Sequence, residues 1–482
     1  MKSDADEGGT AMADDLTWLS AHELGQLYRS RQLSPVEVVG AALDRLDRVD
    51  ARLNVMVTVT ADAAREQALK AEQRFAAGEE LPALYGVPIT VKDLTDTAGV
   101  RTTYGCVAYA DHVPDKDAAA WSRLKDAGTI LLGKTTTPEF GFLGVTESKL
   151  TGTTGTPWDP ARAAGGSSGG AAASTAAGVA PVAWGSDGGG SIRVPASLCG
   201  AVGVKPSTGR IPHLANTEPD TTEGPITRRV VDAALLLDAT VGPHPLDRLS
   251  LPATGERYAE AALAAGDLSG LRIAADRGLL HGPVDVETQR VFAAALEDLR
   301  AAGAVVEETQ VEVPDPMAFA VAYWGPEYMT IVEEMRAAEL DIWPLAVDMA
   351  DRAARLSPVD VGRAARETKT AIYLAYAEVF ADFDLLVTPT TPFPAFPHAG
   401  DVGGPATVNG LPLADPGWHL HRLTESPSHA GLPAVSVPCG FTAGGLPVGL
   451  QIIGPQHADE AVVSAAARYE RATDWWTRHP AL

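Results

Sequence analysis

The segment GGSSGGAAASTAAGVAPVAWGSDGGGSIR, at residues 165–193, contains two clusters of glycine and serine, one at each end. Glycine at this density lets the backbone approach a ligand closely and turn its N–H groups toward it. Either cluster alone is typical of a flexible loop, whereas the two together indicate a functional site. Ser191 follows three glycines, where consecutive main-chain N–H groups can converge on an oxyanion, as acyl transfer requires. The segment therefore predicts that Ser191 is a nucleophile.

A serine nucleophile needs a base, and the sequence offers two kinds. The nearest histidine downstream of Ser191 is His213, so a Ser-His-Asp arrangement would have to assemble from distant parts of the chain. Lys92 is the main alternative, because it directly follows the apolar run 87–91, which would carry it into a sheet. Burial lowers the pKa of a lysine, so that a neutral amine can accept a proton near neutral pH. If Lys92 instead lies at the exposed end of the strand, its side chain reaches solvent.

Outside these residues, strand-like and helix-like patterns alternate along the chain, which is typical of an α/β fold. Short apolar runs predict strands, and amphipathic segments predict helices. The predicted strands are 87–91, 129–132, 271–275, 385–387, 435–437 and 448–452, and the predicted helices are 121–127, 291–301 and 459–472. No linker or change of composition separates independent domains, so we expect one continuous α/β unit.

The N-terminal part has the pattern of a helical cap on this unit. A capping box, in which a glutamate follows a serine by three residues at the start of a helix, occurs at Ser20 and again at Ser34. Residues 61–77 predict a third, alanine-rich helix. We therefore expect a flexible acidic tail at 1–15 and one domain at 16–482, divided into an N-terminal helical part, 16–80, and an α/β core, 81–482.

Composition and charge exclude several classes of protein. The chain has 482 residues, of which 45% are hydrophobic and 21% charged, as in an ordinary soluble globular protein. Its net charge of -24 repels phosphate backbones and anionic lipids, so neither a nucleic acid nor a membrane is expected as a partner. Three widely spaced cysteines, Cys106, Cys199 and Cys439, suggest neither a disulfide framework nor a zinc site. These features, with an acidic N-terminus that lacks a signal segment, favour a cytoplasmic protein.

Lys92 and the two clusters together closely resemble the amidase signature hydrolases. Four further motifs extend the resemblance over most of the chain, from residue 16 to residue 470: Gly86-Val87-Pro88-Ile89, Leu132-Gly133-Lys134-Thr135, Val204-Lys205-Pro206-Ser207 and Gly431-Leu432-Pro433-Ala434. The resemblance implies a single amidase signature domain, with a large central mixed β-sheet flanked by helices. It also implies a catalytic Ser-cisSer-Lys triad.

The resemblance implies a role for each residue of the clusters. Ser191 would be the nucleophile, Ser167 the bridging serine, placed before a cis peptide bond, and Lys92 the base. The residues implied for the oxyanion hole are Gly188, Gly189, Gly190 and Ser191, and those implied to support the reacting groups are Ser168, Asp187 and Arg193. The sequence departs from the family's commonest pattern at Ser186, Gly188 and Ser428-His429-Ala430, which concerns the substrate pocket rather than the reaction.

The implied function is metal-independent hydrolysis of C–N acyl bonds through a covalent acyl-enzyme, without a cofactor. The substrate would be a small amide, an aryl amide or a carbamate (urethane), and an ester presents the same carbonyl. The alternative function is that of the amidase-type component of a tRNA-dependent amidotransferase complex. A homodimer formed through the N-terminal helices is also compatible with the sequence.

Candidate walls of the substrate pocket are mostly aromatic. They are Tyr104, Phe140, Phe142, Arg210, Trp324 and Tyr328, and the proline-rich segment 388–417 is a further candidate wall or lid. An apolar pocket would favour aryl or long acyl groups. Arg210 would instead anchor a polar or carboxylate end of the substrate.

Three further motifs suggest other functions but lack the pattern that should surround them. The Walker A string at 128–135 has an apolar strand between its glycines, which cannot wrap a phosphate. The G-x-S-x-G string at 166–170 is not preceded by the apolar strand of a nucleophile elbow. His419 and His421 would share one face of a strand, but no third metal ligand accompanies them, so we expect a surface or packing role.

Overall fold

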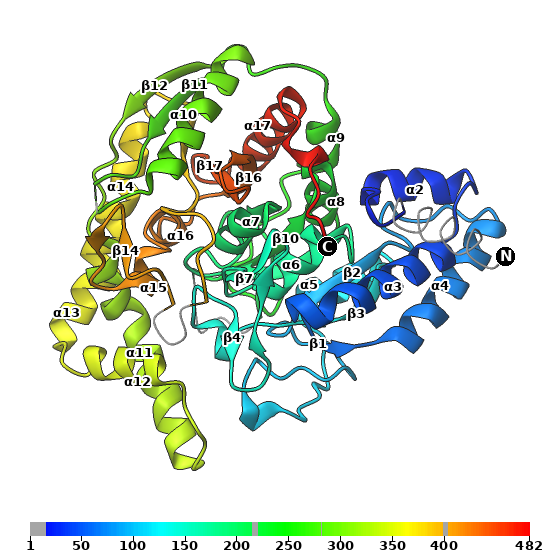
Figure 1. Cartoon of the computed structure of the whole chain (residues 1–482), viewed down its shortest axis with the longest axis horizontal. Helices are drawn as coiled ribbons and strands as arrows, with labels where there is room; N and C mark the ends of the chain where they lie inside the picture. Colours follow the sequence, from blue (N-terminus) through cyan, green and yellow to red (C-terminus); the bar gives the residue numbers. More distant parts are fainter. Residues whose placement is uncertain (1–15, 215–219, 281, 399–402) are drawn as a thin grey trace.

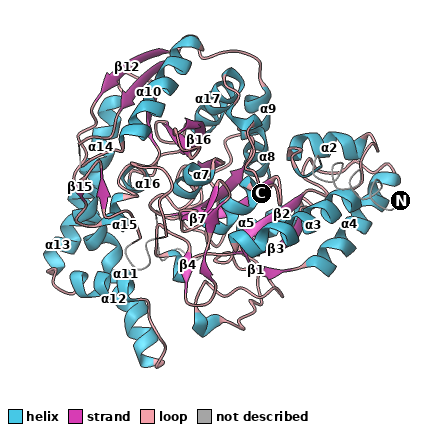
Figure 2. Ribbon diagram, in the orientation of Figure 1, coloured by secondary structure: helices cyan, strands magenta, loops and turns pink. Residues whose placement is uncertain are grey.

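The computed structural model of the chain describes residues 16–214, 220–280, 282–398 and 403–482. These residues build a central sheet of eleven strands with helices on both sides (Figure 1, Figure 2). The order of the strands in the sheet is β1-β3-β2-β8-β10-β9-β16-β17-β13-β11-β12. Their bounds are β1 (Met56–Val59), β2 (Pro88–Lys92), β3 (Ile130–Thr135), β8 (Val182–Asp187), β9 (Val202–Lys205), β10 (Thr222–Thr227), β11 (Arg272–Asp276), β12 (Val305–Thr309), β13 (Leu385–Pro389), β16 (Ala434–Phe441) and β17 (Pro447–Ile453).

The sheet mixes parallel and antiparallel pairs. Strand β2 runs parallel to both of its neighbours, β3 and β8, whereas β10 is antiparallel to β8 and to β9. The expected α/β fold with a large mixed sheet is therefore confirmed. Because β2 and β8 are parallel neighbours, their carboxyl ends, Lys92 and Asp187, lie at the same edge of the sheet.

Alternate side chains of the central strands enter two different cores. Val182 and Trp184 of β8 belong to one hydrophobic core, whereas Ala183 between them belongs to the other. Every residue of β2 and β3 is buried, because helices cover both faces of the sheet. This explains why these strands are continuous apolar runs, and why a lysine at the end of β2 is carried into the interior.

The N-terminal part begins as predicted. Helices α2 (Ala21–Arg29) and α3 (Pro35–Leu53) both start at a capping box, and α4 (Ala61–Ala76) follows them. The part expected to be helical also contains one strand, β1, which pairs antiparallel with β3 at the edge of the sheet. This strand has only four residues and one buried position, too short a pattern to predict. The acidic tail expected at 1–15 lies outside the described residues.

The two glycine and serine clusters each lead into a buried helix. The first precedes α6 (Gly169–Ala176), all of whose residues are buried, and the second joins β8 to α7 (Arg193–Cys199). The other α-helices of the described residues are α5 (Ala119–Asp126), α8 (Val230–Thr240), α9 (Tyr258–Leu263), α10 (Val286–Ala301), α11 (Pro316–Ala337), α12 (Pro344–Ala353), α13 (Pro358–Arg363), α14 (Lys369–Val379), α15 (Pro416–His419), α16 (Glu425–His429) and α17 (Asp459–Ala472). Figure 1 shows α11 and α12 at the opposite end of the molecule from the N-terminal helices.

Two smaller expectations meet different outcomes. The Walker A string lies on β3 as expected, so its residues form a sheet and no phosphate loop. The placement of His419 and His421 on a strand is wrong, because His419 ends α15 and His421 lies in the turn that follows. None of the described helices is long and apolar enough to cross a membrane.

Candidate active site

Lys92, the last residue of β2, is fully buried. Its Nζ lies 2.7 Å from Ser167 Oγ and 2.9 Å from Ser186 Oγ, so two hydroxyl groups surround the amine. Ser186 is a partner that the sequence did not suggest for this lysine, although β8 carries it beside β2. The expectation that this strand carries Lys92 into the interior is confirmed, and its exposure to solvent is excluded.

Ser167 is joined to Gly166 by a cis peptide bond. The bond precedes Ser167, which corrects the expectation that Ser167 stands before it. Glycine is required at position 166, because a Cβ there would lie 2.7–2.9 Å from backbone atoms of residues 143 and 145. The next residue ties the clusters together: the Ser168 N–H donates to Ser191 O at 3.1 Å, and Ser168 Oγ donates to Ser186 O at 3.2 Å.

Ser191 lies in the turn between β8 and α7 and is partly exposed to a cavity that Ser167 also lines. Among the described residues, none accepts a hydrogen bond from the backbone N–H of Gly189, Gly190 or Ser191. Gly190 has φ 136°, and a Cβ there would lie 2.1 Å from Thr424 Oγ1, so only glycine fits this position. The turn thus presents a row of main-chain donors beside a serine hydroxyl, an arrangement that can stabilise an oxyanion.

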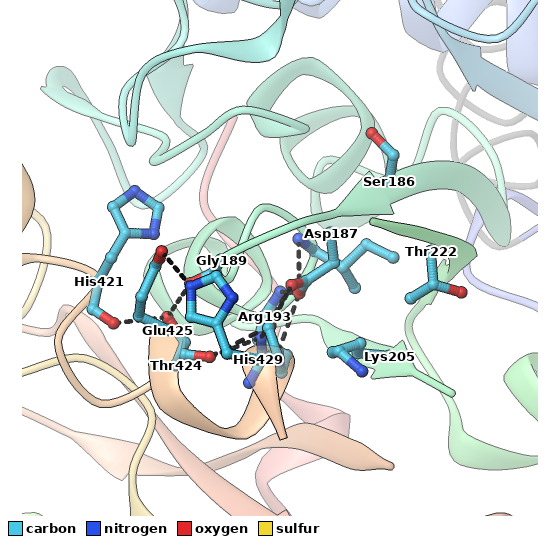
Figure 3. A network of polar contacts seen from close by, with 12 residues as sticks. Ser186, Asp187, Gly189, Arg193, Lys205, Thr222, His421, Thr424, Glu425 and His429 are labelled. Carbon is cyan, nitrogen blue, oxygen red and sulfur yellow. Dashed lines mark hydrogen bonds and ion pairs between the residues drawn. The ribbon is translucent and has the colours of Figure 1, made fainter. Parts of the chain in front are cut away.

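A buried ion pair anchors this turn (Figure 3). The Arg193 guanidinium contacts both oxygens of Asp187, at 2.9 Å and 2.8 Å, and both side chains are fully buried. Arg193 also donates to Gln451 Oε1, Thr424 O and Ser428 Oγ. Although burial raises the pKa of the Asp187 carboxyl, Arg193 lowers it to about 2. Asp187 ends β8 and Arg193 begins α7, so the ion pair fixes both ends of the turn that carries Ser191.

The first prediction concerns this ion pair. Asp187→Asn leaves the Arg193 guanidinium buried without its counter-charge, which should lower the free energy of unfolding by about 3–5 kcal/mol. The midpoint of urea unfolding, measured by circular dichroism, reports this loss. The matched control is Glu307→Gln, because Glu307 pairs with Arg272 at the surface and both are about half exposed; its effect should stay below about 1 kcal/mol. Equal effects of the two variants would contradict the anchoring role.

The pH dependence of this contribution follows from the same pair. Because the pKa of Asp187 is lowered from 3.8 to about 2 in the folded protein, its carboxylate stabilises the fold above pH 3.8. The contribution is lost as the pH falls from 3.8 toward 2, where the carboxylate takes up a proton.

The cavity beside Ser191 has a volume of about 310 Å³. Both serines of the expected triad, Ser167 and Ser191, line it. Four of the six residues proposed from the sequence as pocket walls also line it: Phe140, Phe142, Trp324 and Tyr328. The remaining lining residues are Leu94, Thr95, Gly141, Leu143, Ser186, Gly188, Gly189, His213, Thr221, Glu223, Glu327, Ile331, Trp418, His421 and Glu425.

Two residues proposed for the pocket lie outside it. Arg210 is buried and pairs with Glu256 at 3.2 Å and with Asp459 at 3.3 Å, so its charge serves the fold and cannot anchor a substrate. The Tyr104 hydroxyl donates to Asp96 at 2.7 Å. Neither residue is among those that line the cavity.

A second cavity, of about 260 Å³, adjoins the first. The two share four lining residues, Phe142, Leu143, Trp418 and His421. The far side of the second cavity is formed by α12 and by residues 415–417 of the proline-rich segment. The described residues of that segment therefore form a wall of the second cavity and not of the first. Trp418, which directly follows the segment, lines both cavities.

Two polar residues of the site are not predicted from the sequence. His421, for which the sequence predicts a surface or packing role, lines both cavities, and burial lowers its pKa below the ordinary histidine value. Glu425, which also lines the first cavity, belongs to the short helix α16, whose pattern resembles a loop. In the described ranges, no group of three or more histidine, cysteine, aspartate or glutamate side chains is arranged to hold a metal ion. All three cysteines are buried free thiols.

Comparison with known proteins gives a family match, two relatives and one similar solved structure. The family described as Amidase matches residues 37–463. An acylamidase of Rhodococcus erythropolis is 38% identical over 476 residues, which cover 97% of this chain and 98% of the relative. The A-type subunit of the glutamyl-tRNA(Gln) amidotransferase of Moorella thermoacetica is 36% identical over 503 residues, covering 97% and 99%. The crystal structure of a bacterial aryl acylamidase has a TM-score of 0.87 and 32% identity, covering 95% of this chain and 98% of that one.

Proposed function

This chain belongs to the Amidase family, the amidase signature enzymes, and we propose that it acts alone as a serine hydrolase of C–N acyl bonds. The observation that carries the proposal is the contact between a fully buried amine, Lys92 Nζ, and Ser167 Oγ at 2.7 Å. Ser167 in turn lines the same cavity as Ser191. A buried amine in contact with a hydroxyl that faces the same cavity as Ser191 supports the roles of base, bridge and nucleophile for Lys92, Ser167 and Ser191.

In the first step Ser191 Oγ attacks the carbonyl carbon of a bound amide. Ser167 takes the proton from Ser191 and passes its own proton to the neutral amine of Lys92. The developing oxyanion is stabilised by the backbone N–H groups of Gly188, Gly189, Gly190 and Ser191, each donor contributing roughly 3 kcal/mol. These N–H groups are fixed by the turn that Asp187 and Arg193 anchor, so little reorganisation is needed during the reaction.

In the second step the C–N bond breaks and an acyl-enzyme forms on Ser191. The proton held by Lys92 returns through Ser167 to the departing nitrogen, which leaves as a neutral amine. Water then attacks the ester carbonyl of the acyl-enzyme, giving up its proton along the same path, and Ser191 is regenerated as the acid is released. Every proton transfer in these steps is assigned to side chains of this chain.

The walls of the cavity support an aryl or long acyl group in the substrate. Phe142 and Tyr328 have ring centroids 4.0 Å apart, and Trp418 packs against Phe142, so one side of the cavity is an aromatic surface. An aryl amide would bury its ring there. The names of two relatives, an acylamidase and an aryl acylamidase, agree with this class of substrate. Carbamates and esters present the same carbonyl, and we propose them as secondary substrates.

The alternative function is that of a component of an amidotransferase, which the similarity to the Moorella thermoacetica protein suggests. The strongly acidic composition disfavours direct contact with tRNA. The two functions are separated by gel filtration of the purified chain, followed by a turnover assay with 4-nitroanilides, free amides and aryl carbamates. Independent turnover of the lone chain supports the hydrolase, whereas inactivity until a partner is added supports the amidotransferase. The same elution volume tests the homodimer.

A prediction about substrate length follows from the two adjoining cavities. Trp418 lines both, so Trp418→Ala should join the cavity of about 310 Å³ to that of about 260 Å³. We expect the ratio of kcat/KM for an octanoyl anilide over an acetyl anilide to rise about 3- to 10-fold, because the added methylenes gain a place to be buried. A thermal melt checks that the variant is folded. An unchanged or lower ratio would show that the second cavity is not continuous with the acyl site.

A further inference from the structure

Glu425 brings a carboxylate to the wall of the active-site cavity. The residue starts α16 and is only 4% exposed, yet it lines the cavity together with Ser191 and Gly189. A Cβ built on Gly189 would lie 1.9 Å from Glu425 Oε2, so this oxygen lies directly against the donor-rich turn. The proposed hydrolysis gives this carboxylate no role, since it neither moves a proton nor stabilises the oxyanion.

The two oxygens of Glu425 are bonded unequally. Oε1 accepts a hydrogen bond from Trp324 Nε1 at 2.7 Å and another from His429 Nε2 at 2.8 Å. No group in the described ranges donates a hydrogen bond to Oε2. Oε2 is not one of the fully buried side-chain oxygens that lack a partner, so it is open to the cavity that Glu425 lines. A hydrogen-bond donor from a ligand in the cavity would complete it.

Hydrogen-bonded groups on the other side of Glu425 keep it ionised, and Figure 3 shows one of them, His429, beside it. His429 lies between two carboxylates, with Nδ1 2.9 Å from Asp220 and Nε2 2.8 Å from Glu425. Although burial lowers the pKa of His429, hydrogen bonds to both carboxylates raise it above its ordinary value. Burial also raises the pKa of Glu425, but the bond from His429 lowers it below the ordinary value. Lys369 pairs with the other oxygen of Asp220, so the positive charges lie on the far side of Glu425 from the cavity.

The cavity wall offers no lysine or arginine to repel a cation, as far as the described residues that line it show. Two histidines, His213 and His421, also line the cavity, and burial lowers the pKa of His421 below the ordinary histidine value. Glu223 adds a second buried carboxylate, whose two oxygens accept hydrogen bonds from Thr95 and from Trp184. An anion would therefore be repelled from this cavity, whereas a cation would be attracted at short range.

We infer that the preferred substrates are amides that carry an ammonium group, which donates to Glu425 Oε2 when the amide carbonyl reaches the turn at Ser191. This inference rests on the proposed function, because it names the class of amide that the same site accepts. The ammonium group belongs either to the acyl part or to the amine part of the substrate. Both attachments satisfy the same carboxylate, and the experiment below separates them.

The test uses two series of anilides that differ only in charge. In the first series, 4-nitroaniline is acylated with 4-(aminomethyl)benzoic, 4-methylbenzoic or terephthalic acid, so the acyl part is cationic, neutral or anionic. In the second, the aniline nitrogen of 4-(aminomethyl)aniline, 4-methylaniline or 4-aminobenzoic acid is benzoylated, so the amine part is cationic, neutral or anionic. Dissociation constants are measured by calorimetry on Ser191→Ala, and kcat/KM on the parent chain.

In at least one series, we expect the cationic member to bind about tenfold tighter than the neutral one, and the anionic member to bind weakest. Dissociation constants that agree within twofold for all members of both series would overturn the inference. The proposed function has its own readout: if Ser191→Ala hydrolyses the probes at the parent rate, the function is wrong whatever the affinities are.

Glu425→Gln tests the residue itself, because it preserves shape and removes charge. The preference for the cationic over the neutral member should fall about tenfold in this variant. The matched control is Glu334→Gln, on the exposed face of α11, which should keep the parent's preference. An unchanged preference in Glu425→Gln would overturn the assignment to this residue. If Glu425→Gln does not fold, the dissociation constants measured on Ser191→Ala in the two series still decide whether the cationic member is preferred.

Discussion

Ser191→Ala should reduce kcat/KM for any amide that the parent hydrolyses by about 10⁴- to 10⁶-fold, the loss expected when a nucleophile is removed from a site whose residues act as a unit. The residual activity would come from the oxyanion donors and from substrate binding, which the substitution leaves in place. The measurement is release of 4-nitroaniline at pH 8, with enough enzyme to detect a rate near that of the uncatalysed reaction.

The control for this loss is a serine of the same fold that lies outside the site. Ser464 on α17 hydrogen-bonds to Ala261 O, and Ser464→Ala should keep kcat/KM within about twofold of the parent. Rapid mixing of the parent with excess substrate should also show a burst of 4-nitroaniline, because an acyl-enzyme accumulates when its hydrolysis is slow. Turnover of Ser191→Ala within tenfold of the parent would exclude Ser191 as the nucleophile.

The parts of this site that the sequence predicts are those held by local chain geometry. The clusters at 165–170 and 185–193 are dense in glycine because neighbouring atoms approach within 3 Å of the sites where a Cβ would stand, as at Gly166 and Gly190. Such steric requirements leave a local trace in the sequence. Lys92 is similar, because its position follows from the apolar strand before it, whose register alone carries the amine to the edge beside β8.

The parts that the sequence does not predict depend on contacts between distant segments. Arg210 was a reasonable candidate for a substrate anchor, but its partner Asp459 lies 249 residues away, and nothing local indicates that the pair forms. Glu425 is the converse case: the sequence does not suggest it, and its hydrogen bonds come from Trp324 and from His429, which is itself bonded to Asp220. The role of such a charged residue cannot be predicted from its own segment, because tertiary packing decides which partner it contacts.

The pocket shows the same division. Their aromatic type alone makes residues 140, 142, 324 and 328 candidates for the pocket, and the structure brings all four to one cavity. Tyr104 is of the same type, and its carbonyl accepts a hydrogen bond from the Phe140 N–H, yet it does not line the cavity and its hydroxyl donates to Asp96. Side-chain type thus predicts the chemistry of the walls, while tertiary packing decides which aromatic residues contribute.

Lys92→Met should reduce kcat/KM by about 10³- to 10⁴-fold, because a general base that moves the proton of the nucleophile contributes within this range. The variant replaces a buried amine by an apolar chain of similar length, so its free energy of unfolding should not fall as the activity does. Lys205→Met is the matched control. Lys205 is equally buried but donates to the main-chain carbonyls of Pro206 and Leu432, away from the cavity, so its replacement should keep turnover within about tenfold.

The pH dependence of the parent tests the same assignment without a substitution. Burial lowers the pKa of two other buried lysines of this fold, Lys134 and Lys205, to about 8 each. Burial disfavours the charged form of a lysine, and the fully buried Lys92 works as a base only when neutral, so kcat/KM should rise with pH. The rise should be absent from the residual activity of Lys92→Met, since that variant has lost the titrating amine. An optimum near pH 5, or the same rise in both proteins, would mean that another group supplies the base and that the contact between Lys92 and Ser167 is structural.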